Sequence, residues 1–197
     1  MKKIGNLNPY ALDYPVCLSQ QQLRMREFLR EEDDNMSQAI IYEPCEEEYT
    51  NEYLNKQEVK RALHVMDNIL WEECSRTTKY ILADKMLPMQ KYYDIILNSK
   101  THPNLRILVY SGDDDSVCGT IGTQRWIYNL GFPTLQLWDT WYNTDGQTAG
   151  FKTFFKTPFS KESRLAFITV HSAGHEVPTY TPKDALELFD MYINNQL

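Results

Sequence analysis

The feature that most constrains this sequence is a short apolar run that ends just before a tight turn and a histidine. Residues 165–170 read LAFITV, and their β-branched members favour a buried strand. The small residues Ser172, Ala173 and Gly174 then allow a sharp turn before His175. A histidine fixed on a loop after a buried strand can act as a general base. The same pattern also fits a loop histidine whose ring is hydrogen-bonded and has no catalytic role.

A second apolar run is followed by acidic residues. Residues 105–110 read LRILVY and predict another buried strand, after which Asp113, Asp114 and Asp115 stand in a row. A glycine followed by aspartates is typical of a solvated turn. Alternatively, one carboxylate points inward and orients an imidazole. A strand ending in an acid, followed along the chain by a strand ending in a histidine, has the order of the last two members of an α/β-hydrolase triad.

Further motifs occur in order along the chain. They are NPY at 8–10 with YPVC at 14–17, EPC at 43–45 with YLN at 53–55, Trp71 with Cys74 and Ser75, YSGDDD at 110–115, and AGHEVP at 173–178. Through these motifs the whole chain resembles the C-terminal part of the serine carboxypeptidases, a secreted, vacuolar or lysosomal family. Several motifs agreeing in order are far more specific than any one of them.

The resemblance implies an α/β fold, namely the C-terminal part of an α/β-hydrolase fold with part of the helical cap. Residues 1–52 would be a cap or insertion remnant with a processing-type loop. Within them, the helix-competent stretch that begins at residue 21 runs into the acidic residues 31–34. Residues 53–197 would be the C-terminal part of the hydrolase domain.

Three residues receive roles from the resemblance, and a fourth receives one from its position. Asp115 would be the triad acid, which accepts a hydrogen bond from one ring nitrogen of His175 and fixes its tautomer. His175 would be the triad base. Cys118 stands where some family members carry a free thiol that lines the site. Glu176 directly follows the base, so we expect its side chain near the departing amino acid, with an ordinary surface glutamate as the alternative.

The cysteines have two interpretations. The resemblance implies a disulfide between Cys17 and Cys45, and a partner for Cys74 in an N-terminal half that this chain lacks. The alternative is four reduced, buried cysteines in a cytosolic protein.

The nucleophile of such a triad is missing from the sequence. A serine hydrolase needs a serine on a strained elbow, usually G-x-S-x-G, and this motif does not occur. Ser111 and Ser172 lie beside the predicted acid and base but lack the elbow's glycines. We therefore expect a serine-type carboxypeptidase represented by its C-terminal part, inactive alone and dependent on an N-terminal half that carries the serine. Its substrates would be peptide or protein C-termini. The alternatives are a non-catalytic remnant that binds a partner, or an acyltransferase or esterase of the same fold.

Composition excludes several other classes of partner. The net charge of −7 and the pI near 5.1 argue against binding to nucleic acid or to an anionic membrane. The sequence contains no run of about 18 apolar residues, so it predicts no transmembrane helix. The histidines lack H-E-x-x-H spacing and the acidic run lacks the EF-hand pattern, so we expect no metal and no cofactor. The first residues lack the apolar core of a signal peptide. The resemblance, however, implies a secreted, vacuolar or lysosomal protein. The two expectations agree if the chain is a fragment, a processed chain or an incomplete gene product.

Periodicity predicts the remaining elements. Asn55 should cap a helix that contains His64, with Glu58 completing a capping box. A helix over 78–98 should kink or break at Pro88. We also expect a helix over 122–130, a hairpin of 135–138 with 150–155 whose aromatic residues serve packing, and a helix over 182–194. The inner face of this last helix should comprise Ala185, Leu186, Leu188, Phe189 and Ile193. With half of a hydrolase sheet absent, the strands near 105 and 165 should both show unpaired edges.

Overall fold

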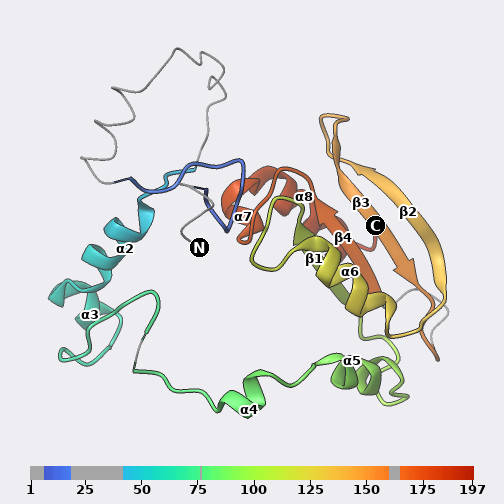
Figure 1. The fold of residues 1–197 in the computed structure, drawn as a ribbon, viewed down its shortest axis with the longest axis horizontal. Helices are drawn as coiled ribbons and strands as arrows, with labels where there is room; N and C mark the ends of the chain where they lie inside the picture. The colour runs from blue at the N-terminus through green and yellow to red at the C-terminus, as the bar shows by residue number, and fades with distance from the viewer. Residues whose placement is uncertain (1–6, 19–41, 76, 160–164) are drawn as a thin grey trace. The chain divides into compact units, whose positions relative to one another are not determined.

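The computed structural model describes residues 7–18, 42–75, 77–159 and 165–197. The chain forms two compact units (Figure 1). The larger unit combines Met1–Tyr14 with Pro88–Leu197, and the smaller unit is Pro15–Leu87. The predicted loop and helix-competent stretch at 21–36 lie outside the described residues. The predicted domain boundary between residues 52 and 53 falls within a helix, and the assignment of residues 1–52 to a cap stays a prediction.

The larger unit is built on a mixed sheet of four strands in the order β1-β4-β3-β2. The strands are β1 (Ile107–Gly112), β2 (Thr134–Tyr142), β3 (Thr148–Phe155) and β4 (Leu165–Val170). β1 and β4 are parallel, whereas the other pairs are antiparallel. All six residues of β4 are buried, as the apolar run predicts. Among the described strands, β1 pairs with β4 alone, as expected for an edge, but β4 lies between β1 and β3, so the expectation of an unpaired edge on β4 was wrong.

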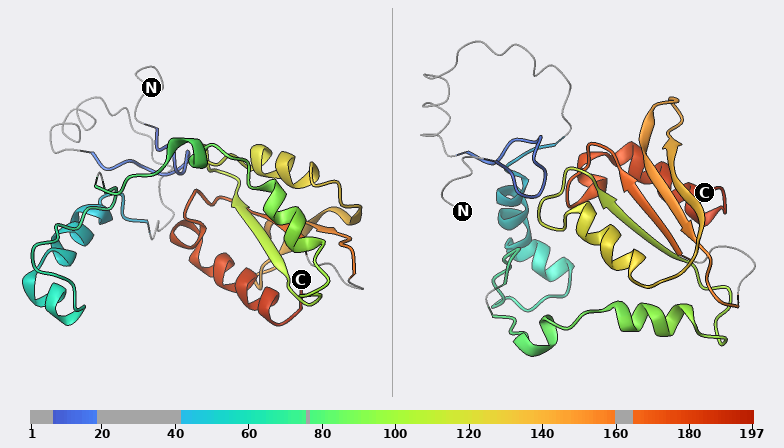
Figure 2. Two further views of the ribbon diagram at one scale, coloured as in Figure 1. Left: turned by 90° about the horizontal axis from the view of Figure 1, so that it is seen from below. Right: turned by 45° about the vertical axis from the view of Figure 1, so that its right-hand side comes forward.

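Helices cover both faces of this sheet (Figure 2). They are α5 (Gln90–Leu97), α6 (Thr120–Tyr128), the short α7 (Val177–Tyr180) and α8 (Pro182–Ile193). α5 and α6 share one face, where Leu97 and Ile127 pack with three buried strand residues, Phe155, Leu165 and Phe167. Each such side chain contributes about 1.5–3 kcal/mol by its burial. Among the described helices, none is long and apolar enough to cross a membrane.

The structure confirms the predicted hairpin, which is formed by β2 and β3. Gly146 has φ +74° in the turn, a conformation that glycine adopts without strain. Trp141 is buried and donates from Nε1 to the Thr169 carbonyl of β4 at 2.8 Å. Trp138 stacks on Phe151 with 5.3 Å between ring centroids. These aromatic residues fix the hairpin to itself and to β4, which agrees with the packing interpretation.

The C-terminal helix faces the sheet differently from the prediction. Leu188 is buried and Ala185 is partly buried, but Leu186, Phe189 and Ile193 are exposed. Apolar residues occur on more than one side of this helix, so composition alone left its orientation undetermined. Packing against the sheet selects the face that carries Leu188.

The smaller unit contains α2 (Glu46–Leu54), α3 (Gln57–Ala62) and α4 (Leu82–Lys85). The predicted disulfide between Cys17 and Cys45 is present, with Cα atoms 4.9 Å apart. The helix expected over 78–98 is broken at Pro88 into α4 and α5, as predicted, because proline cannot donate a backbone hydrogen bond within a helix.

The capping prediction for Asn55 was wrong. The residue before α3 is Lys56, and no side chain among the described residues caps the helix. The Asn55 amide instead holds a distant segment, because its Oδ1 accepts from the Trp71 N–H at 2.9 Å and its Nδ2 donates to the Trp71 carbonyl at 3.0 Å. His64 lies beyond the end of α3 with φ 56°, rather than within the helix.

Candidate active site

The parallel pairing of β1 and β4 brings two functional loops together. Gly112 is opposite Val170, so both strands end at the same edge of the sheet. The following residues are bonded across, because the N–H of Asp113 donates to the Val170 carbonyl at 3.1 Å and that of Asp114 to the Ala173 carbonyl at 3.0 Å. A Cβ on Gly112 would stand 2.1 Å from the Ala173 oxygen. This glycine is therefore required by the close approach of the two loops.

Asp115 and His175 meet at this edge. The Asp115 Oδ2 lies 2.9 Å from the His175 Nδ1, and its Oδ1 accepts from the N–H groups of Val117 at 2.7 Å and Cys118 at 3.0 Å. The Asp115 side chain is 5% exposed and that of His175 is 34% exposed. An ionised carboxylate only accepts hydrogen bonds, so Nδ1 carries the proton and Nε2 is left with a lone pair. Such an imidazole can accept a proton from an attacking group at Nε2.

A second aspartate–histidine pair, which sequence reasoning missed, lies beside the first. The Asp113 Oδ2 is 2.7 Å from the His171 Nδ1, and its Oδ1 accepts from the Ser172 N–H at 2.8 Å. The side chains of His171 and Asp113 are 63% and 36% exposed. The register explains the pair, since each residue directly follows one member of the Gly112–Val170 match. Which strands pair in parallel depends on the whole fold, and no local motif marked Asp113 and His171 as partners.

Asp114 has a third partner and a third environment. Its Oδ2 accepts from the N–H of Asp13 at 2.9 Å. Partial burial raises the pKa of the Asp114 carboxyl, and the charges of Asp13 and Asp113 raise it further, whereas the hydrogen bond from Asp13 acts in the opposite direction. The three consecutive carboxylates therefore point to three different groups.

Each of the two predicted substrate-binding residues follows one member of the Asp115–His175 pair along the chain. Cys118 is a free, exposed thiol, and Glu176 is exposed and directly precedes α7. One ligand atom each of Asp115, Cys118 and His175 lies within 4.8 Å of the others, a set that could in principle hold a cation. Both Asp115 oxygens already accept hydrogen bonds, so a cation would compete with the bond that orients His175. The expectation of no metal stays a prediction.

The serines near the pair have other contacts. Ser111 is buried in β1, and its Oγ lies 3.0 Å from the Thr120 Oγ1. Ser172 is exposed and has φ 56° in the turn. Neither arrangement provides the glycine-flanked elbow of a hydrolase nucleophile.

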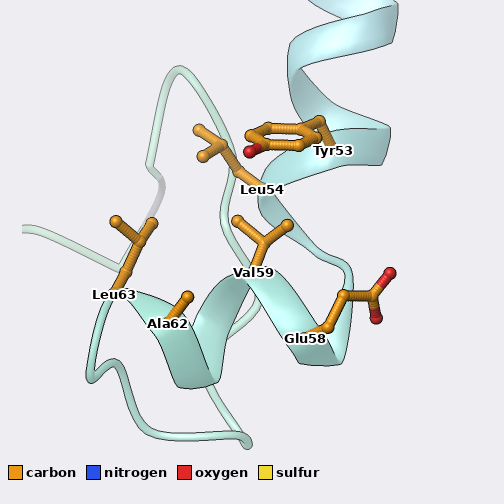
Figure 3. A pocket seen from close by; sticks show the side chains of 6 residues that line it. All are labelled: Tyr53, Leu54, Glu58, Val59, Ala62 and Leu63. Carbon is orange, nitrogen blue, oxygen red and sulfur yellow. The ribbon is translucent and has the colours of Figure 1, made fainter.

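A cavity of about 430 Å³ lies elsewhere, in the smaller unit (Figure 3). It lies between α2 and α3 and is lined by Tyr53, Leu54, Glu58, Val59, Ala62 and Leu63. The Glu58 carboxylate points away from the apolar side chains (Figure 3). Apart from Glu58 and the Tyr53 hydroxyl, the lining is apolar.

Known proteins resemble this chain along nearly all of its length. The family model for serine carboxypeptidase matches residues 1–195. Serine carboxypeptidase-like 26 of Arabidopsis thaliana is 34% identical over 195 residues, covering 98% of this chain and 40% of the relative. Serine carboxypeptidase 24 of the same plant is 31% identical over 198 residues, covering 97% of this chain and 40% of the relative.

A solved structure shows the same fold. A prohormone-processing carboxypeptidase from Saccharomyces cerevisiae matches with a TM-score of 0.66 at 20% identity, covering 96% of this chain and 36% of that one. The predicted α/β-hydrolase fold is thereby confirmed for the part that is covered. The chain spans about 40% of the length of these two curated relatives.

Proposed function

This chain belongs to the serine carboxypeptidase family, and on that premise we propose that Asp115 and His175 are the acid and the base of its catalytic triad. The reaction is the release of C-terminal amino acids from peptides by acyl transfer. The observation that carries this proposal is the buried Asp115 carboxylate hydrogen-bonded to the Nδ1 of His175, with Nε2 left as the proton acceptor.

The reaction needs a serine from another polypeptide segment. The serine Oγ forms a bond to the carbonyl carbon of the substrate's last peptide bond as its proton moves to the His175 Nε2. The C–N bond then breaks and His175 returns the proton to the departing amine. Water next attacks the acyl ester, gives its proton to His175, and the serine recovers that proton as it leaves. Asp115 stays ionised throughout and stabilises the imidazolium.

The exposed Asp113–His171 pair supports this assignment by contrast. A triad acid must hold its histidine in one tautomer, which burial and two additional N–H donors favour for Asp115. Asp113 and His171 are far more exposed, and solvent weakens such a pair. We assign this second pair to joining the ends of β1 and β4.

Cys118 and Glu176 would contribute to substrate binding. The Cys118 thiol lies within 4.8 Å of the ligand atoms of the pair, which supports a role for it at the edge of the reaction site. Glu176 is exposed beside His175, and a carboxylate there favours a basic departing residue. Both roles depend on His175 being the base.

The test is labelling with a fluorophosphonate, which reacts with activated serines. We expect no labelling and no carboxypeptidase turnover from residues 1–197 alone, because the elbow and its oxyanion donors are not encoded here. Adding the complementary N-terminal portion in trans should restore labelling, and His175→Ala should abolish it. Stoichiometric labelling of the lone chain would contradict the proposal. A reconstituted mixture that folds but never reacts would favour the non-catalytic alternative.

A further inference from the structure

We propose that residues 8–14 form a strap that positions His175, with Tyr10 as its central positioning residue. The proposal rests on the proposed function, since it takes His175 to be the catalytic base. The strap contains the NPY motif, to which the proposed reaction assigns no role. It crosses the ends of β1 and β4 and contacts the loop that follows each of them.

The strap bonds directly to the backbone of the histidine. The His175 N–H donates to the Tyr10 carbonyl at 2.7 Å. The Tyr10 ring also contacts the imidazole, with ring centroids 5.5 Å apart and planes tilted by 58°. Tyr10 thus contacts both the main chain and the side chain of His175. The Asn8 side chain is buried and holds the turn that presents Tyr10, because its Oδ1 accepts from the Tyr10 N–H at 3.0 Å.

The strap also bonds to the loop of the triad acid. Ser116 donates to the Pro9 carbonyl from its N–H at 3.2 Å and from its Oγ at 2.6 Å. The N–H of Leu12 donates to the Asp114 carbonyl at 3.2 Å. These residues flank Asp115 on both sides, so the strap links the acid's loop to the base's loop independently of the bond between their side chains.

The strap packs closely against Gly174, where only a glycine fits. A Cβ on Gly174 would stand 2.2 Å from the Tyr10 oxygen and 2.5 Å from the Ala11 Cβ. Ala11 is fully buried. Any side chain at position 174 would therefore collide with the strap and push it away from the turn that carries His175.

The far end of the strap is fastened by Tyr14. Its hydroxyl donates to the Ser172 carbonyl at 2.9 Å, and its ring packs edge-on against Tyr180 with centroids 4.7 Å apart. Burial raises the pKa of the Tyr14 hydroxyl, and the charges of Asp114 and Asp13 raise it further, so it remains a donor at neutral pH. Both ends of the turn from Ser172 to His175 are therefore held by the strap.

A base needs this second restraint. The Asp115 hydrogen bond fixes Nδ1, but the ring can still pivot about that bond and carry Nε2 away from an attacking hydroxyl. A displacement of about 1 Å in a reacting group costs about 10²-fold in rate. The Tyr10 carbonyl limits the backbone of His175, and the Tyr10 ring limits the rotation of the imidazole.

The experiment compares Tyr10→Ala, Tyr10→Phe and Gly174→Ala in the full chain. Gly122→Ala is the matched control, because a Cβ there meets nothing within 4 Å. Histidine-labelled NMR first reads the imidazole tautomer and the exchange of the Nδ1 proton in the chain alone. Turnover is then measured with the complementary portion supplied in trans. Tyr10 is 43% exposed, so its truncation leaves the folding core intact and provides the test if Gly174→Ala does not fold.

We expect Tyr10→Ala and Gly174→Ala to speed exchange of the Nδ1 proton and to lower kcat about 10- to 100-fold with KM little changed. Tyr10→Phe should behave like the unmodified chain, because its ring and carbonyl remain. A wild-type Nδ1 signal and wild-type kcat in Tyr10→Ala would overturn the strap's role, while the activity itself would leave the proposed function standing. The reconstituted enzyme could be inactive while Tyr10→Ala still speeds exchange of the Nδ1 proton. That result would contradict the proposed function but support the role of the strap in positioning His175.

Discussion

The sharpest prediction concerns the two neighbouring aspartates that each bond a histidine. In Asp115→Asn the side-chain oxygen keeps accepting from the N–H groups of Val117 and Cys118, where two donors converge on Oδ1. The new amide NH₂ then faces the His175 Nδ1, 2.9 Å away in the parent protein. An NH₂ group only donates, so Nδ1 must become an acceptor and the ring proton moves to Nε2. The nitrogen that should accept the serine proton is then already protonated.

The magnitude follows from this tautomer change. Loss of the correct tautomer with geometry retained lowers kcat by about 10⁴-fold in serine-protease triads, and we expect a loss of that order. The matched control is Asp113→Asn, which alters the exposed pair with His171. An exposed pair contributes about 0–1 kcal/mol, so this variant should lose less than about fivefold.

Two measurements check the prediction. In the lone chain, NMR of labelled histidine should show the His175 proton on Nδ1 in the parent protein and on Nε2 in Asp115→Asn. In the reconstituted enzyme, kcat/KM on a short peptide should fall with the tautomer change. If Asp113→Asn is the crippling variant and Asp115→Asn is nearly active, the assignment of acid and base is refuted, and the pair of Asp113 and His171 takes that role.

Three further predictions concern stability and specificity. Replacing Cys17 and Cys45 by serine opens a disulfide with a sequence separation of 28, which should cost about 3–4 kcal/mol in denaturant unfolding of the smaller unit; an equal midpoint for both proteins would contradict this. The raised pKa of Asp114 means that its contribution to stability is full below its ordinary value of 3.8 and is lost as pH rises through the raised value; Asp114→Asn should flatten unfolding free energy in that window, and an unchanged pH profile would argue against it. Glu176→Gln should reduce the preference for lysine over leucine at the substrate C-terminus, and equal preferences would remove Glu176 from substrate selection.

Sequence patterns predicted where the strands lie better than they predicted what surrounds each side chain. β4 was predictable because five of its six residues are apolar and the sixth, Thr169, is β-branched. β1 is shifted by two residues, since Ser111 and Gly112 extend the strand where the Ala173 carbonyl approaches. The orientation of α8 could not be predicted, because the exposed Leu186 is as apolar as the buried Leu188.

The candidate site was predictable only where a motif specified it. Family resemblance pointed to Asp115 and His175, whereas the acidic run alone left three equivalent carboxylates. The Asp113–His171 pair follows from strand register, and the strap's contacts to His175 join residues far apart in sequence. Hydrogen bonds of this kind depend on which loops the fold brings together, and no local pattern reports that.

The acidic run shows how a fold gives identical side chains different tasks. Asp113, Asp114 and Asp115 carry the same charge and would repel one another in an extended loop. Here each accepts an N–H from a different segment: the turn after β4, the strap and its own loop. Partial burial raises the pKa of Asp114, whereas the Asp115–His175 hydrogen bond involves none of the groups that contact Asp114. Burial and a fixed set of donors, rather than position in the motif, therefore make Asp115 the carboxylate suited to orient a base.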